Sequence, residues 1–570
     1  MNELKNIDRR LAILLMPIAW PRLICFLFVV LGFECGCRTL QSERPTISHP
    51  RIVNIFNFVR NSDYRLANSE DTLYEATRQE IQLIKPTKLS ATWALEYDAL
   101  INPRYQKLFK EQLGTNNEIA AWWEIPRPLV EKARLKWRGH DHEWDSTANV
   151  GFSPGYTPDE RRKLVDVYMA DFKAIFGNYP RTVGSWYIDE VTLAYMAELY
   201  GIVASCNCKD QVGTDGYTLW GGYWNQAYYP SRLNAYMPAQ TKAGQIDVPI
   251  SRMLGSDPIY QGYTPGMWTL EPVYPAAGGS DDWVAWFMNN FIHQPALAFG
   301  FTQVGQENSF GWEAMKTGLT LQIALLAGQA KVGEVQVLTL AQAGQWFRQH
   351  HPLTPPTAVV CLNDWKHEGR ETVWYNSRFY RLNLLWEKDV FFVRDLHLFD
   401  EHVISPTHDR ALKTTFLAYH TLPVMDGALW SGSEKPGIWP VLISSDGATS
   451  PLIPEGSPVV KEQSPTELSI AQSLRGGGVF SMVCSETTVS ATGTDGRGQP
   501  LNWAWNLVGG ASQKAAIKNV ATNGVTYHYE GADYSLQLAS DSGACEQLTN
   551  GVVRLTPNRF GKVVLTLGVY

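Results

Sequence analysis

Residues 51–59, Arg51-Ile-Val-Asn-Ile-Phe-Asn-Phe-Val59, form an apolar run with the length and composition of a buried β-strand. Apolar residues at helical spacing follow from Leu73 to Ile84 and stop at Lys85-Pro86. A second apolar run, Lys88–Leu95, completes a strand–helix–strand unit. Because a helix joining two strands is the building block of a parallel sheet, this stretch decides the fold class of the first half of the chain as α/β.

The same alternation continues along the chain as far as residue 352. Further strands are expected at Glu118–Trp123, Thr182–Ile188, Ile202–Cys206, Trp268–Glu271 and Leu297–Val304, and helices at Pro103–Leu113, Pro158–Phe176, Thr192–Tyr200, Asp282–Ile292 and Gly311–Gly328. Seven strand–helix units in roughly 300 residues fit a closed or nearly closed barrel better than an open sheet. We therefore predict a (β/α)7-type barrel over residues 50–352.

The pattern changes after the Pro-rich linker Thr354-Pro355-Pro356. Short β-rich runs such as Thr372–Tyr375, Val390–Val393 and Val479–Val483 are separated by Gly, Asp, Ser and Pro, and no strong helical pattern occurs. This arrangement predicts an all-β sandwich domain over residues 353–570.

The first 37 residues have the layout of an export signal. A basic region ending at Arg22 precedes an apolar run, Leu23–Phe33. Gly36-Cys37 suggests lipoprotein processing, although Glu34 and Cys35 fit such a site poorly, so ordinary cleavage and an uncleaved anchor both stay open. With residues 38–49 as a linker, we expect a secreted, periplasmic or cell-surface protein of a bacterial envelope. Membrane contact is expected only through this N-terminal segment.

Composition excludes some classes of protein. Hydrophobic residues make up 45% of the 570 residues and charged residues 18%, which is globular. The net charge is −7 and no basic run is present, so nucleic acid is not expected as a partner. The chain has 21 Trp, 25 Tyr and 22 Phe, rings that either stack on sugars or fill a large core. The eight cysteines form no zinc-type pairs.

Acidic residues recur where the predicted barrel strands end, and in such barrels the chemistry gathers at the carboxyl ends of the strands. Glycoside cleavage needs two carboxyl groups, one as an acid and one as a nucleophile or base. Helix capping or salt bridging is the alternative use of any one of them. The strand-end candidates are Glu96, Asp98, Glu124, Asp189, Glu190, Glu271 and Glu307.

Residues 50–350 resemble the seven-stranded barrel superfamily of glycoside hydrolases and polysaccharide deacetylases, which includes the family-57 and family-38 glycosidases. The similarity lies in the order of elements and in strand-end segments. These segments are Phe56-Asn57-Phe58, Tyr97-Asp98-Ala99-Leu100, Trp122-Trp123-Glu124-Ile125, Gly184-Ser-Trp-Tyr-Ile-Asp189-Glu190, and the run from Cys206 through Asp210-Gln211 and Gly213-Thr-Asp215-Gly216-Tyr217. A barrel followed by a β-sandwich also resembles the two-part layout of a bacterial domain family whose chemistry is unassigned.

The resemblance implies roles for individual carboxylates. The family-57 enzymes have their nucleophile at the end of strand four, which matches Asp189 or its neighbour Glu190. Their acid lies near strand seven, which matches Glu307. Glu124 at strand three is the rival acid, because its apolar neighbours would raise its pKa.

One departure from the family pattern concerns metal. Deacetylases of this fold have an Asp pair at the end of strand one and a His-x-x-x-His pair. Here strand one ends in Asn57-Phe58-Val59-Arg60, and the barrel half has no His-x-x-x-His. We therefore expect no metal and no other cofactor in the leading hypothesis.

Two further groups of residues are candidates for substrate contact. His140 and His142 alternate with acids in the segment 138–145, where a metal site, substrate contact and a structural loop all stay open. The aromatic residues of the long insertion are either sugar platforms or its local packing. The full set of predicted substrate-binding residues is Asp98, Trp123, His140, His142, Asp210, Asp215, Trp220, Trp224, Tyr229 and Trp268.

The sequence thus favours an exported glycoside hydrolase that acts on poly- or oligosaccharide with two carboxylates. A metal-dependent polysaccharide deacetylase using the cluster His140–Asp145 is the first alternative. A non-catalytic glycan-binding protein is the second, because a fold does not establish an activity.

Overall fold

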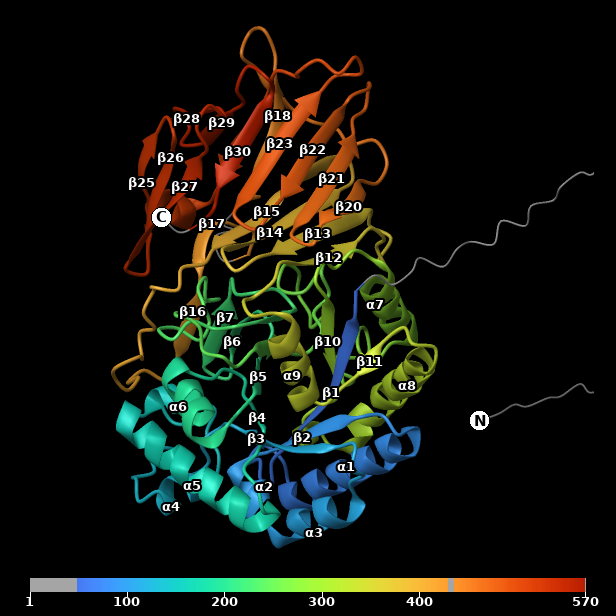
Figure 1. Ribbon diagram of the computed structural model, residues 1–570, viewed down its shortest axis with the longest axis vertical. Coiled ribbons are helices and arrows are strands. Elements are labelled where there is room, and N and C mark those ends of the chain that lie inside the picture. Colours follow the sequence, from blue (N-terminus) through green and yellow to red (C-terminus); the bar gives the residue numbers. More distant parts are fainter. Residues whose placement is uncertain (1–48, 429–434, 569–570) are drawn as a thin grey trace, which may run out of the picture. The chain divides into compact units, whose positions relative to one another are not determined.

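The computed structural model describes residues 49–428 and 435–568. Seven strands, in the order β10-β1-β2-β3-β4-β5-β9, pair in parallel. Figure 1 labels β10 and β1 to β5 of this sheet. No ladder among the described residues joins β9 to β10, so the barrel is nearly closed, as predicted. The strands of this sheet are β1 (Arg51–Val59), β2 (Ala91–Leu95), β3 (Glu118–Trp122), β4 (Thr182–Gly184), β5 (Ala204–Asn207), β8 (Ala227–Tyr228), β9 (Ile250–Arg252), β10 (Gly300–Val304) and β11 (Gln336–Val337).

Helices cover the outer face of the barrel sheet. Alternate residues of β1 point to opposite faces, so Val53, Ile55 and Val59 pack outward with the helices while Phe56 and Phe58 point inward. The helices are α1 (Ser69–Ile84), α2 (Tyr97–Ile101), α3 (Pro103–Gln112), α4 (Arg127–Lys132), α5 (Pro158–Phe176), α6 (Glu190–Tyr200), α7 (Asp281–His293), α8 (Trp312–Lys331) and α9 (Leu340–His350).

Helix α9 contacts the inner side of the barrel near the amino ends of its strands. The amide of Leu340 donates to Thr92 Oγ1 at 2.8 Å, and the amide of Ala341 donates to Glu118 Oε2 at 3.0 Å. A Cβ on Gly344 would lie 2.3 Å from the Cβ of Ala204, so only glycine allows this approach to β5. Since α9 occupies the amino ends, the carboxyl ends are where a site can form.

Local sequence signals set several of these boundaries. Strand β1 and helix α5 have the predicted bounds, and α5 begins with a capping box in which Thr157 and Glu160 satisfy each other's backbone amides. Helix α5 ends at Gly177 with φ +86°.

One predicted strand is wrong. The sixth parallel strand is Ile250–Arg252 within the long insertion, whereas Trp268–Glu271 is a loop in which Thr269 makes a single bridge to Ser256. A three-residue strand is too short to produce a periodic signal, which is why it could not be identified from the sequence. Helix α9 was also not predicted.

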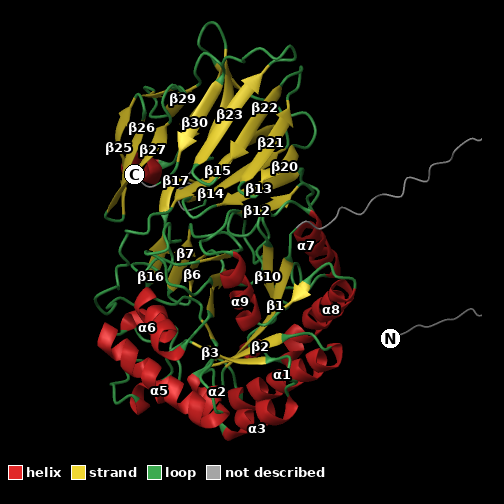
Figure 2. Cartoon of the chain, viewed as in Figure 1, coloured by secondary structure: helices red, strands yellow, loops and turns green. Residues whose placement is uncertain are grey.

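The C-terminal part is built from β-sheets, as predicted (Figure 2). Phe391 of one sheet contacts Phe480 of the other, with ring centroids 5.4 Å apart. The ten-stranded sheet contains β12 (Thr357–Cys361), β13 (Arg370–Asn376), β14 (Tyr380–Glu387), β15 (Val390–Leu398), β17 (Leu422–Asp426), β18 (Gly437–Ile443), β19 (Thr449–Pro451), β24 (Trp503–Val508), β28 (Ala544–Gln547) and β29 (Val553–Thr556). The eight-stranded sheet contains β20 (Val459–Ser464), β21 (Glu467–Ser473), β22 (Val479–Cys484), β23 (Thr488–Thr494), β25 (Ile517–Ala521), β26 (Gly524–Tyr529), β27 (Ala532–Leu538) and β30 (Lys562–Thr566), and a short helix, α10 (Ala511–Ala516), precedes β25.

The C-terminal part also contributes to the barrel insertion. Strand β16 (Leu417–His420) pairs in parallel with β7 (Tyr217–Trp220), which pairs with β6 (Gln211–Thr214). The domain boundary at residues 352/353 stays a prediction.

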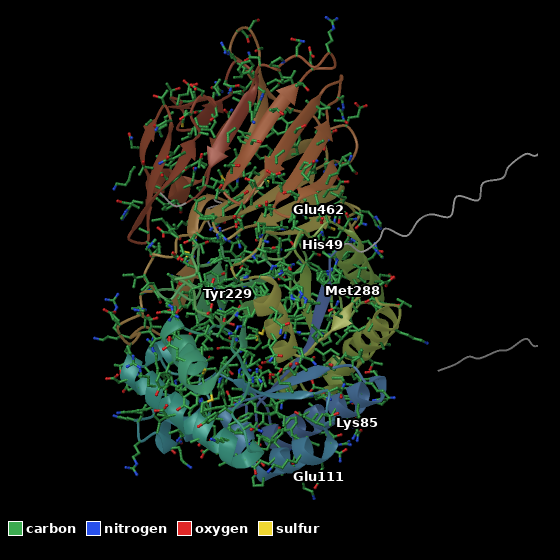
Figure 3. All side chains as sticks on the ribbon, in the orientation of Figure 1. His49, Lys85, Glu111, Tyr229, Met288 and Glu462 are labelled. Carbon is green, nitrogen blue, oxygen red and sulfur yellow. The ribbon has the colours of Figure 1, made fainter. Side chains whose placement is uncertain are left out.

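The described chain begins at His49, whose Nε2 lies 2.7 Å from Glu462 Oε2 of β20 (Figure 3). The predicted leader, residues 1–37, and the linker before His49 lie outside the described residues. In the described part, no helix combines the length and apolarity that crossing a membrane requires.

Candidate active site

Arg60, the first residue after β1, lies at the centre of a group of carboxylates. Its Nη2 is 2.7 Å from Glu124 Oε2 and its Nη1 is 3.4 Å from Asp63 Oδ2. Glu124 also accepts a hydrogen bond of 2.9 Å from the indole of Trp122, two residues earlier on the same inward face. Burial raises the pKa of Glu124, and the charge of Arg60 opposes that rise. Arg60 and Glu124 thus form an ion pair that solvent does not reach.

Glu96 and Asp98 extend this cluster from the end of β2. Glu96 is fully buried, and neither of its carboxyl oxygens accepts a hydrogen bond from a donor in the described residues. Burial and the charge of Asp98 raise the pKa of Glu96 well above its usual value. Burial also raises the pKa of Asp98 to about 6, although the amides of Asn61 and Ser62 donate to it. Glu96 is therefore the proton-carrying member of the pair.

Glu307 is the partly exposed carboxyl of the cluster. A parallel bridge pairs Glu307 with Phe58, and bridged residues of parallel strands point to the same face, so its side chain lies on the inner side of the barrel. Burial raises the pKa of Glu307 to about 7, the charge of Glu124 adds to this, and Arg60 opposes it. A carboxyl with this pKa can carry a proton near neutral pH and still contact a ligand.

Aromatic rings form the floor beside these carboxyls. Phe58 stacks on Trp122 with centroids 4.1 Å apart, and Trp186 stands edge-on to both rings. Trp186 is partly exposed, whereas Phe58 and Trp122 are buried. Trp186 is thus the ring of this group that can meet a sugar face.

A second row of rings lies at the rim. Tyr64, which is 48% exposed, stacks on His142 at 4.2 Å, and His142 stacks on His140 at 5.5 Å. The carboxylate of Asp145 lies within hydrogen-bonding distance of His140, with 2.8 Å between Oδ2 and Nδ1. These contacts bring two of the predicted substrate-binding residues, His140 and His142, into one stacked row with Tyr64.

Asp215 joins the group from the turn between β6 and β7. Its carboxylate is 34% exposed and lies 3.9 Å from the guanidinium of Arg65. The positive charge of Arg65 also lowers the pKa of Glu307. Burial raises the pKa of Tyr274, and the negative charges of Glu271, Glu307 and Asp215 raise it further. Asp215 and Glu307 are the partly exposed carboxyls of this group.

Glu271 lies close by but is largely buried. Lys209 Nζ is 3.4 Å from Glu271 Oε2, and Thr269 Oγ1 donates to the same oxygen at 2.9 Å. These partners give Glu271 a role in holding the loop that follows Trp268.

Asp189 lies apart from this cluster. It is fully buried, caps α6 through the amide and hydroxyl of Thr192, accepts a hydrogen bond from Ser153, and lies 3.0 Å from Arg161 Nη1. Burial alone would raise its pKa, but Arg161 and these hydrogen bonds leave it below the usual value. Asp189 has the environment of a buried structural ion.

Glu190 is also buried, and its contact is with the C-terminal part. Its Oε1 lies 3.0 Å from Nδ1 of His408, which is partly exposed. The segment around His408 is further held by Arg161, which donates to the carbonyls of Thr407 and Arg410.

Most rings predicted as sugar platforms are enclosed. Trp224 stacks on Trp374 of β13 at 3.9 Å, and Trp220 Nε1 donates to Asp426 of β17 at 2.8 Å. Tyr229 donates to the carbonyl of His351, and Trp123 packs on the outer, helix-covered side of the sheet. Trp268 differs, because it is partly exposed beneath Lys366, whose Nζ lies 3.9 Å from its ring centroid.

Asp210 belongs to a buried network between the barrel and the ten-stranded sheet. It lies 2.6 Å from Arg252 and 2.5 Å from Arg381, and Arg381 also pairs with Asp395. Because these contacts enclose Asp210, its carboxylate is not available to a ligand.

The donor set at the strand ends does not fit a divalent metal. Its carboxylates surround the guanidinium of Arg60, a resident cation that would repel a second one. In the described residues, one group of three potential ligands comes within reach of a single ion: Asp395, His397 and Asp426. That group already binds Arg381, Trp220 and Tyr263.

Several residues of the site were not identified from the sequence as functional. Arg60 could have been, since a charge directly after an apolar strand marks a barrel rim. Trp186 and Arg65 could not have been identified, because their place in the site depends on contacts with residues more than 100 positions away in the chain.

Solved structures similar to this chain include three that bear carbohydrate-related descriptions. A candidate glycoside hydrolase/deacetylase from Parabacteroides distasonis superposes with a TM-score of 0.50 at 16% identity, covering 69% of this chain and 95% of that one. A candidate polysaccharide deacetylase from Mycobacterium smegmatis gives 0.34 at 12% identity, with 54% and 92% covered. A family-57 branching enzyme from Thermococcus kodakaraensis gives 0.29 at 8%, with 53% and 71% covered.

No protein-family profile matches the chain, and no curated protein matches it in sequence. The likeness to the Parabacteroides protein shows the barrel fold that the order of elements and the strand-end segments predicted.

Proposed function

We propose that the protein is an exported carbohydrate-active enzyme that hydrolyses glycosidic bonds of a poly- or oligosaccharide. The observation that carries this proposal is that Glu307 and Asp215 are both partly exposed at the strand-end cluster, where Arg65 lies 3.9 Å from Asp215 and its charge also acts on Glu307. Glycoside cleavage requires one protonated and one ionised carboxyl on the two sides of the scissile bond. Export rests on the N-terminal sequence alone.

Glu307 is the proposed general acid. Its raised pKa supports a protonated carboxyl at neutral pH, and its partial exposure lets it reach the leaving oxygen. The charge of the Glu124 carboxylate behind it helps to hold the proton on Glu307. Glu124 is therefore proposed as a positioning residue, because it is buried against Arg60.

Asp215 is the proposed second carboxylate, acting as nucleophile or as the base for water. The guanidinium of Arg65 lies 3.9 Å from its carboxylate. Trp186 supplies the adjoining ring for the sugar, and the Tyr64–His142–His140 row extends the contact surface along the rim.

The test is product analysis with the purified protein on a panel of α- and β-linked oligosaccharides, some of them acetylated. We expect new reducing ends that disappear in Glu307→Gln. Release of acetate without reducing ends would replace this function with deacetylation. Tight binding with neither product would indicate a glycan-binding protein.

A further inference from the structure

Segment 413–420 of the C-terminal part lies beside Asp215 at the rim of the barrel. Strand β16, within this segment, pairs in parallel with β7. The amide of Leu417 donates to the carbonyl of Gly216 at 2.9 Å, and Gly216 directly follows Asp215 in the turn. Extending this register by one residue places Phe416 opposite Gly216, at the spacing of about 5 Å that separates paired strands. Phe416 is therefore a near neighbour of the second proposed carboxylate.

The approach of this segment to the Asp215 turn is tight enough to require a glycine. Gly216 has φ +71°, and a Cβ on it would lie 2.8 Å from the carbonyl oxygen of Thr415. The same carbonyl accepts a hydrogen bond of 2.9 Å from the amide of Ala148. The C-terminal segment, the Asp215 turn and the loop that contains Ala148 thus meet at one point.

Phe416 exposes its ring at this point. Alternate residues of a strand face opposite sides, so Leu417 and Tyr419 pack in the inner cluster with Phe58 while Phe416 faces away from it. Phe416 is 45% exposed, and the residue before it, Thr415, is also exposed. The ring is therefore a single apolar surface with a polar neighbour, open to a ligand.

Tyr64 is a second exposed ring at the same loop. It stacks on Trp144 with centroids 5.8 Å apart, and Trp144 belongs to the loop that contains Ala148. This loop therefore contacts the neighbours of three partly exposed side chains that come from different parts of the chain. They are Tyr64, Asp215 and Phe416. The rim that surrounds the proposed carboxylate thus continues onto the C-terminal part.

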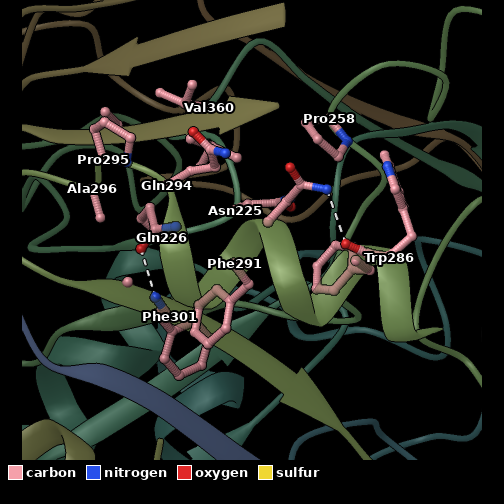
Figure 4. A pocket seen from close by; sticks show the side chains of 15 residues that line it. Asn225, Gln226, Pro258, Trp286, Phe291, Gln294, Pro295, Ala296, Phe301 and Val360 are labelled. Atoms are coloured by element: carbon pink, nitrogen blue, oxygen red, sulfur yellow. Dashed lines mark hydrogen bonds between the residues drawn. The ribbon is translucent and has the colours of Figure 1, made fainter. Parts of the chain in front are cut away.

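The enclosed space between helix α7 and strands β10 and β12 differs from this open rim. Its volume is about 40 Å³, which is room for water but not for a sugar ring (Figure 4). Gln226, which lines it, accepts a hydrogen bond of 2.9 Å from the amide of Phe301, as Figure 4 shows. This contact joins the barrel insertion to β10, so the space has a structural use.

We propose that Phe416 binds a sugar unit of the substrate beside Asp215, so that the substrate is a polysaccharide held at more than one unit. The inference rests on the proposed function, because the bound unit belongs to the chain that Glu307 and Asp215 cleave. An aromatic face packs on the C–H face of a sugar ring. One ring with a polar neighbour suits a sugar better than a protein partner or a membrane, which need a larger apolar area.

The test compares polysaccharides with single sugars. Affinity gel electrophoresis measures binding to soluble starch, laminarin, xylan and mannan, and kinetics compare each polysaccharide with the 4-nitrophenyl glycoside of its own sugar. Phe416→Ala removes the ring and Phe416→Tyr keeps it. Phe560→Ala, which removes a 65% exposed ring between β29 and β30, is the matched control. Circular dichroism confirms that each variant is folded.

We expect Phe416→Ala to weaken binding of the preferred polysaccharide and to raise its KM roughly threefold to tenfold, with the KM of the nitrophenyl glycoside unchanged. Phe416→Tyr and Phe560→Ala should behave like the original protein. Equal effects on polysaccharide and glycoside, no effect on either, or binding to none of the four polysaccharides would overturn the inference. Polysaccharide binding that depends on Phe416 without hydrolysis would support Phe416 as a sugar-binding residue and count against the proposed hydrolysis.

A second copy of the chain is the other occupant that the experiment can detect. Val212, on strand β6 of the same three-stranded sheet, is 55% exposed. An apolar contact between copies would involve both Phe416 and Val212. Sedimentation velocity measures the oligomeric state of the original protein, Phe416→Ala and Val212→Ser. A dimer that both substitutions dissociate, with sugar binding unchanged, would overturn the inference.

Discussion

The guanidinium of Arg60 lies 2.7 Å from the carboxylate of Glu124, and neither side chain is more than 1% exposed. An ion pair removed from water in this way keeps its charge, because each partner compensates the other's desolvation. The negative charge of Glu124 then acts on Glu307, whose pKa it helps to raise. The buried pair itself cannot contact a substrate, but its Glu124 raises the pKa of the neighbouring Glu307, which is partly exposed.

Glu307→Gln should lower turnover about 100-fold or more on substrates with a sugar leaving group, because the general acid is lost. Substrates with a dinitrophenyl leaving group need little protonation and should lose far less. Steady-state kinetics on both substrates measure the difference. Glu313→Gln on the exposed face of α8 is the control. Equal losses on both substrates would argue against an acid role for Glu307.

The dependence of kcat on pH should reflect the ionisation of Glu307. Since the pKa of Glu307 is about 7, its protonated fraction, and with it kcat, should fall as pH rises through 7. The raised pKa also means that Glu307 contributes stability below its unfolded pKa that is lost as pH rises through 7. Rate profiles and denaturant unfolding from pH 4.5 to 8.5 measure both effects. The fall of kcat above pH 7 should be absent in Glu307→Gln. A fall that persists in this variant would come from another ionisable group.

Asp215→Asn should remove turnover while leaving the fold intact, because its carboxylate is 34% exposed and its ion pair with Arg65 is long. Added azide should restore product formation by replacing the missing nucleophile or base. Product analysis by NMR checks this. Asp409→Asn, in the C-terminal part, is the control. Turnover within a few-fold of the original protein would remove Asp215 from the mechanism.

Arg60→Met should cost about 3–5 kcal/mol of folding stability, since it leaves the charge of Glu124 buried and unpaired. Glu124→Gln in the same chain should recover part of that loss. A double-mutant cycle by urea denaturation gives the coupling, expected at about 1–3 kcal/mol. Additive losses would mean that the two side chains do not interact energetically.

Asp189→Asn separates a catalytic from a structural use of this residue. The resemblance to family-57 enzymes predicts a stable protein without turnover. The contacts with Arg161, Thr192 and Ser153 predict instead about 3 kcal/mol of destabilisation, with turnover per folded molecule retained. Melting temperature and active-fraction kinetics on one preparation decide between the two.

Much of the fold could be predicted because its signals are local. Strand β1 is a continuous apolar run, and α5 carries its own cap at Thr157 and its own stop at Gly177. The strand Ile250–Arg252 could not be predicted, because three residues within a long insertion become a strand only through their pairing with β5. Helix α9, by contrast, begins with a capping box at Thr339, so its start does have a local signal in the sequence.

The sequence by itself determined that parallel strands alternate with helices and that carboxylates follow the strands. Both features can be identified from consecutive residues, because the spacing of apolar residues and the end of an apolar run are local. Only the tertiary structure decided which of those carboxylates share a solvent-accessible site. Asp189 and Glu307 both follow a barrel strand, yet Arg161 and Ser153 enclose the first while the second stays partly open beside Arg60. Burial and charge pairing depend on side chains brought from distant segments, and no local pattern encodes them.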